Sequence, residues 1–124
     1  MQPPYTLPFD VFWQWIGTHP NCILRAGTPE SIIYDDDDLH WTFVGYENGA
    51  LGVQVLRGKR FMGEIFIAAE EITYVQGVLG EVEGEFIFEL IAESETNRTA
   101  LYFFVLTHGY DEEDDVPPVS GRVH

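Results

Sequence analysis

The sequence predicts a mainly β protein of the α+β class. An N-terminal helix is expected to pack on a curved antiparallel sheet, or a partial barrel, of about six to seven strands. Apolar residues recur with a helical period of 3.6 near the N-terminus and with a period of two after Pro20. Turn signals such as Asn48-Gly49 separate the later apolar segments. The 124 residues fit one domain, which we place at residues 1–110.

The helix is predicted over residues 6–18. Thr6 can cap its first turn, and Gly17 and Pro20 end it. Four apolar residues share one helical face, so we expect them in the core: Phe9, Phe12, Trp13 and Ile16.

A second apolar stripe on the same helix consists of Val11 and Trp15, which lie four residues apart. One sheet face covers only about half of a helix that is apolar nearly all round. The second stripe is therefore expected to form an exposed patch, which monomers seldom tolerate. This predicts a homodimer in which Val11 and Trp15 are candidate interaction residues.

Strands are predicted throughout residues 22–108, with a single helical turn near Ala69. Residues 85–93 alternate between apolar and acidic side chains, which is typical of a sheet with one buried and one solvated face. Residues 99–107 are apolar on both faces, which predicts a central strand.

The charge balance excludes several classes of protein. There are 21 acidic residues against six Lys and Arg, a formal net charge of −15, which disfavours nucleic-acid binding. The longest apolar run, residues 100–106, is too short to cross a membrane. Cys22 is the only cysteine, and no signal peptide is visible, so a cytoplasmic location is expected. The acidic tail, residues 111–124, is predicted to be disordered.

Two charged segments are candidate binding residues. The first is an acidic run that would suit a basic protein partner: Asp35, Asp36, Asp37 and Asp38. A calcium loop of the EF-hand type fails there, because Trp41 occupies the position that needs glycine. The second segment is a weaker candidate for an anion patch, in which Arg57, Lys59 and Arg60 surround a predicted turn. Solubility, or pairing with neighbouring carboxylates, is the simpler explanation for these cations.

Residues that could carry catalysis are sparse. His19 and Cys22 lie three apart across a turn, which could bring an imidazole near a thiol, but a turn histidine beside a small buried thiol is the simpler interpretation. Glu85 and Glu89 would lie ~13 Å apart along a strand, too far for an acid–base pair without a partner strand. Because the common catalytic and phosphate-binding motifs are absent, we predict no catalytic residue, cofactor or metal.

These observations predict a small, acidic, non-enzymatic protein-interaction or binding module that self-associates. Its expected partners are a second copy or a basic protein, and neither nucleic acid nor membrane. The alternative is a protein that binds a small apolar or amphipathic molecule on the aromatic concave face of its curved sheet. An enzyme is the third hypothesis. A filled interior would favour the first hypothesis, and a pocket with convergent polar groups and perturbed titrating residues would favour the second or the third.

Overall fold

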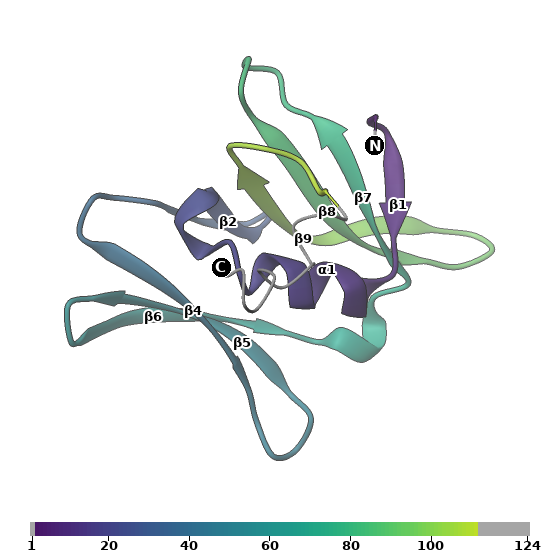
Figure 1. Cartoon of the computed structure of the whole chain (residues 1–124). Coiled ribbons are helices and arrows are strands. Elements are labelled where there is room, and N and C mark those ends of the chain that lie inside the picture. Colours follow the sequence, from purple (N-terminus) through teal and green to yellow (C-terminus); the bar gives the residue numbers. More distant parts are fainter. Residues whose placement is uncertain (1, 112–124) are drawn as a thin grey trace, which may run out of the picture.

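The computed structural model describes residues 2–111, and it confirms a mainly β, α+β architecture with antiparallel sheets (Figure 1). The predicted disorder of residues 112–124 lies outside the described residues. The described chain forms two sheets with one α-helix, α1 (Phe9–Ile16). Among these residues, no helix has the length and apolar character needed to cross a membrane.

The larger sheet has six strands in the spatial order β1-β7-β8-β9-β2-β3. Their bounds are β1 (Tyr5–Leu7), β7 (Tyr74–Leu79), β8 (Phe86–Glu93), β9 (Arg98–Leu106), β2 (Ile23–Thr28) and β3 (Ser31–Tyr34). β9 lies between β8 and β2, as predicted for the segment that is apolar on both faces.

The smaller sheet has three strands in the order β4 (Leu39–Gly45), β5 (Leu51–Arg57) and β6 (Arg60–Ile67). Short 3₁₀ helices precede β2 and β7: η1 (Pro20–Cys22) and η2 (Ala69–Glu71). The second of these is the helical turn predicted near Ala69.

The helix begins later than predicted, because residues 5–7 form β1 and pair with β7. Leu7 precedes a proline, which favours extended backbone, and Pro8 has φ −60° and ψ 145° at the N-cap position. Thr6 is therefore a strand residue and does not cap the helix, which has no side-chain cap.

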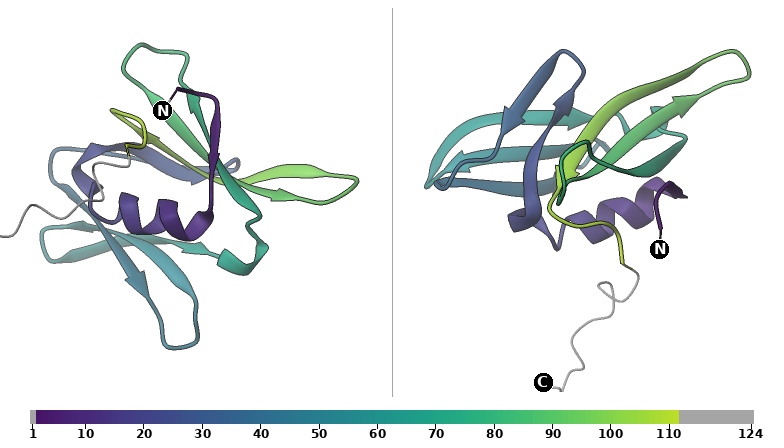
Figure 2. Two further views of the ribbon diagram at one scale, coloured as in Figure 1. Left: turned by 45° about the vertical axis from the view of Figure 1, so that its right-hand side comes forward. Right: turned by 90° about the horizontal axis from the view of Figure 1, so that it is seen from above.

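α1 lies between the two sheets (Figures 1 and 2). On one side Phe12 contacts Phe88 of β8 and Phe104 of β9, with ring centroids 5.1 and 5.7 Å apart. On the other side Trp13 contacts Phe43 of β4. A helix that is apolar nearly all round needs cover on both sides. Here nine strands in two sheets provide that cover, where six or seven strands in a single curved sheet were predicted.

The core between the sheets is filled with side chains. Its largest fully buried members are aromatic and come from both the helix and the larger sheet: Phe12, Trp15, Phe88 and Phe104. From the smaller sheet, Val53, Val55, Ile65 and Ile67 point into the same core. The smaller sheet therefore has one face on the core and one face turned away from α1.

Candidate interaction surface

The expectation that Trp15 faces solvent is wrong. Trp15 is 0% exposed, because it lies under the larger sheet with its ring 5.4 Å from that of Phe88 and 5.3 Å from that of Tyr110. Val11 is half-buried against the same core. The second apolar stripe of the helix is thus covered within the chain, and a contact between copies has to use another surface.

The acidic loop and the basic turn, which are about 20 residues apart in the sequence, lie at the same end of the smaller sheet, on the left in Figure 1. The loop that leads into β4 carries Asp36, and the turn between β5 and β6 follows Arg57. A guanidinium nitrogen of Arg57 lies 3.6 Å from a carboxylate oxygen of Asp36. We call this region the charged end; it consists of Asp35, Asp36, Asp37, Asp38, Arg57, Lys59 and Arg60.

Two contacts within the chain fix the acidic loop. The indole N–H of Trp41 donates a 2.9 Å hydrogen bond to a carboxylate oxygen of Asp35. The amide of Leu39 donates to the carbonyl of Asp36, also at 2.9 Å. Because Trp41 is itself buried, the loop is anchored to the core.

Four charged side chains of this region are free to form ion pairs with a partner. Within residues 2–111, the side chains of Asp37, Asp38, Lys59 and Arg60 make no ion pair, and all four are exposed. The charged end therefore combines one internal ion pair with two acidic and two basic groups that are open to solvent.

The outer face of the smaller sheet exposes large apolar side chains, with Phe61 and Met62 next to the basic turn and Tyr46 and Phe66 near the opposite end of the sheet. This outer face is the side turned away from α1, and Phe61, Met62, Phe66 and Tyr46 are exposed on it. Phe61 is 58% exposed and Phe66 is 64% exposed. Exposed apolar residues on a single sheet are the usual mark of an interaction surface.

A β-bulge exposes two of these residues in succession. Leu56 pairs with Phe61 and Val55 pairs with Gly63, so Met62 is an extra residue without an opposite partner. A bulge shifts the alternation of side chains by one position. Phe61 consequently faces outward with Leu56, although Ile65 and Ile67 on the same strand face the core.

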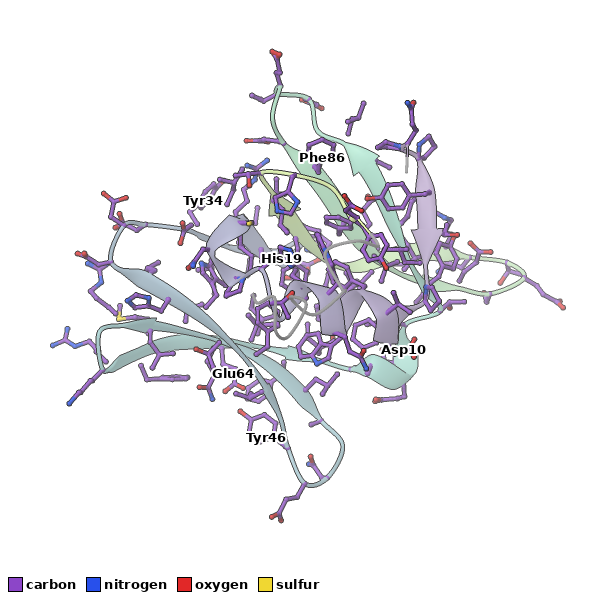
Figure 3. All side chains as sticks on the ribbon, in the orientation of Figure 1. Asp10, His19, Tyr34, Tyr46, Glu64 and Phe86 are labelled. Atoms are coloured by element: carbon purple, nitrogen blue, oxygen red, sulfur yellow. The ribbon has the colours of Figure 1, made fainter. Side chains whose placement is uncertain are left out.

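Polar groups cross the middle of the outer face. The Tyr46 hydroxyl and a Glu64 carboxylate oxygen are hydrogen-bonded, and Gln54 donates to the Tyr46 oxygen at 3.3 Å. The hydrogen bond to Glu64 raises the pKa of Tyr46 above its ordinary value. Figure 3 shows Tyr46 and Glu64 on the side of the sheet away from the helix. A shallow depression beside them is lined by Tyr46, Glu47, Asn48, Ala50 and Phe66.

On the larger sheet, Glu85 and Glu93 are engaged in contacts within the chain. Glu85 accepts two hydrogen bonds from the Arg25 guanidinium, at 3.0 and 3.1 Å. This pairing lowers the pKa of Glu85 and raises that of Arg25. Glu93 lies 3.6 Å from the Arg98 guanidinium and accepts a 2.5 Å hydrogen bond from the Tyr74 hydroxyl. Both contacts explain the acidic residues without an acid–base role.

Cys22 has a histidine partner, but it is His108, 86 residues away in the sequence. Nε2 of His108 lies 3.1 Å from the Cys22 sulfur, and Nδ1 lies 2.9 Å from the carbonyl oxygen of Gly109. A carbonyl only accepts, so Nδ1 carries the hydrogen in the neutral ring and the thiol donates to Nε2.

His19, which the sequence places near Cys22, stacks on Trp15 with ring centroids 4.5 Å apart and lies 5.3 Å from the His108 ring. The sequence could not identify His108 as the partner of Cys22, because His108 follows the end of β9, far from Cys22 in the sequence. Among residues 2–111, no group of three or more His, Cys, Asp or Glu side chains is placed to hold a metal ion.

Among the described residues, we take the outer face of the smaller sheet, with its charged end, as the candidate surface. No known protein family, curated protein or solved structure matches the chain.

Proposed function

We propose that this protein is a small, acidic, non-enzymatic interaction module that self-associates through the outer face of its smaller sheet. The observation that carries the proposal is that Tyr46, Phe61, Met62 and Phe66 are all exposed on the outer face of the smaller sheet, in two pairs near its opposite ends. A monomer gains nothing from exposing four large apolar side chains on one element, whereas a contact with a partner removes them from water.

The size of this apolar surface suits an interface. A large side chain buries about 150–250 Å² when it is covered completely, so the exposed parts of these four side chains amount to roughly 400 Å². A standard interface buries ~800 Å² per partner. Polar and charged neighbours, which form the rim of most interfaces, would supply the remainder.

The distribution of charge favours the same surface. Two copies that each carry a formal charge of −15 repel one another over most of their surfaces. Three of the six basic residues, Arg57, Lys59 and Arg60, lie at the charged end beside Phe61. These three cations offset three of the four aspartates at the same end, so two copies repel one another only weakly there.

The alternative, a small molecule held on the concave aromatic face, has less support. The space between the sheets is filled by α1, and Trp15, Phe88 and Phe104 are at most 1% exposed. A ligand would have to displace packed core side chains, which is costly.

The acidic remainder of the surface suits a basic protein as a further partner, with charge attraction acting mainly on the rate of association. A cytoplasmic location is consistent with Cys22, a free thiol without a disulfide partner.

Sedimentation of the wild-type protein at concentrations up to ~100 µM tests the proposal. We expect a dimer that Phe61→Ser dissociates. Leu79→Ser is the matched control, because Leu79 is 62% exposed on the larger sheet and should leave the dimer intact. A monomer at every concentration, or equal weakening by both variants, would contradict the proposal.

A further inference from the structure

We infer that the second copy binds in a two-fold arrangement, in which the acidic loop of each copy contacts the basic turn of the other. This inference rests on the proposed function and specifies its partner and geometry. The reciprocal contacts join Asp37 and Asp38 of one copy to Lys59 and Arg60 of the other. Phe61 and Met62 follow the basic turn directly and lie at the same end of the sheet, with Phe61 on the outer face and Arg60, one residue earlier, on the opposite face of the strand.

The internal ion pair shows that the loop and the turn are neighbours. Arg57 and Asp36 lie 3.6 Å apart, so the loop and the turn that carry the open charges are adjacent. The Trp41 indole holds the loop through Asp35 at 2.9 Å, and the two-residue turn Gly58-Lys59 holds the basic residues. Both sets of charges are therefore presented by fixed backbone, which lowers the entropy lost on binding.

A surface that carries positive and negative charges side by side selects among partners. A purely basic protein would be repelled by Lys59 and Arg60, and a purely acidic one by Asp37 and Asp38. A second copy turned by a two-fold axis presents both signs in the complementary order, because residue i then contacts residue j and residue j contacts residue i.

The bulge in β6 supports this mode of contact over simple pairing of edge strands. β6 forms one edge of the smaller sheet and pairs only with β5. The extra residue Met62 disrupts the regular ladder, and the basic residues stand at the start of the strand. Both features discourage edge-to-edge extension of a sheet. Side-chain contacts at the charged end do not need an unbroken edge.

Two charge-reversed variants test the inference. The first carries Lys59→Glu and Arg60→Glu, and the second carries Asp37→Lys and Asp38→Lys. Each variant alone should dimerise on the order of 10- to 100-fold more weakly than wild type, because like charges then face one another. Mixing the two should restore a heterodimer, which native mass spectrometry separates from the homodimers by mass.

The second variant also separates specific pairing from general repulsion. It is less acidic than wild type, so relief of net charge alone would strengthen its homodimer, whereas reciprocal pairing predicts weakening. Glu81→Lys with Glu83→Lys is the matched control, because it changes the net charge equally at the exposed turn after β7 and should not weaken the dimer. Unchanged dimers in both charge variants, or no heterodimer on mixing, would overturn the inference. The proposed function would still stand if Phe61→Ser dissociated the wild-type dimer, and a monomeric wild type would overturn both.

Discussion

Trp13 of α1 meets Phe43 of β4 edge to face, with ring centroids 5.2 Å apart and ring planes at 75°. This contact closes the side of the helix that faces the smaller sheet. The opposite side is closed by Trp15, whose ring lies 5.4 Å from that of Phe88. The two tryptophans therefore have separate positions, one partly exposed between helix and small sheet and one fully buried.

The difference between the two tryptophans predicts unequal effects on stability. Trp15→Phe leaves a cavity in a fully buried site and is expected to cost about 1–3 kcal/mol. Trp13→Phe removes a half-exposed ring edge and should cost about 1 kcal/mol or less. Urea denaturation of both variants measures the difference. A larger loss for Trp13→Phe would mean that the helix is rotated relative to this structure.

Gly77→Ala is expected to destabilise the fold by about 1–3 kcal/mol through overpacking. A Cβ atom at this position would lie 2.5 Å from the Tyr5 ring. That ring has little freedom to move, because it contacts Phe88 and its hydroxyl accepts a 2.9 Å hydrogen bond from the amide of Tyr110. Burial of the same hydroxyl raises the pKa of Tyr5.

Gly63→Ala is the control for Gly77→Ala, since Gly63 also lies in a strand but has open space where its Cβ would be. Thermal unfolding should show a lower melting temperature for Gly77→Ala and little change for Gly63→Ala. Similar losses in both variants would indicate a general effect of strand glycines and not the contact with Tyr5.

The ion pair between Arg25 and Glu85 predicts a dependence of stability on pH. The hydrogen bonds from Arg25 lower the pKa of Glu85, so the pair stabilises the fold above the unfolded pKa of the carboxyl. This contribution is lost as the pH falls through the folded pKa, below the ordinary value of 4.5.

The melting temperatures of wild type and Glu85→Gln should therefore differ most near neutral pH and converge in acid. Comparing the two proteins at each pH cancels the titration of the other carboxylates. Glu83→Gln is the control, because Glu83 is exposed and makes no ion pair within residues 2–111. A difference in melting temperature between wild type and Glu85→Gln that stays constant from neutral to acid pH would contradict a stabilising ion pair between Arg25 and Glu85.

His108 is expected to rest in the Nδ1–H tautomer when its ring is neutral. The carbonyl of Gly109 accepts from Nδ1 at 2.9 Å, which leaves Nε2 as the acceptor for the Cys22 thiol. Long-range ¹H–¹⁵N correlation spectra of the histidine rings identify the tautomer directly. Finding Nε2–H would exclude the hydrogen bond from Cys22. Cys22→Ala should leave the tautomer unchanged, since the carbonyl fixes it.

The sequence predicted the fold class because its periodicities are strong, but it could not predict how the helix is covered. Six of the eight residues in α1 are apolar, which indicates cover on two sides or a second chain without deciding between them. The answer depends on the smaller sheet, whose placement results from contacts between distant residues such as Trp13 and Phe43. Trp15 was consequently assigned to the wrong environment.

The candidate surface was predictable only in part. The charges at residues 35–38 and 57–60 are evident in the sequence, but their proximity arises from the antiparallel pairing of β4 with β5, in which Leu39 lies opposite Arg57. The exposure of Phe61 could not be predicted, because strict alternation along the strand places its side chain on the core face with that of Ile65. A bulge at Met62 reverses that alternation, and the adjacent Gly63 suits a bulge without fixing its position.

Amide hydrogen exchange at about 1 µM and at about 200 µM tests most directly whether the outer face and its charged end form a contact between two copies. We predict that the higher concentration slows exchange in residues 35–38, in the turn at 57–60 and in the first half of β6, while the turn between β7 and β8 exchanges equally at both. Protection that is unchanged at the charged end, or that is gained around residues 79–85, would contradict this account.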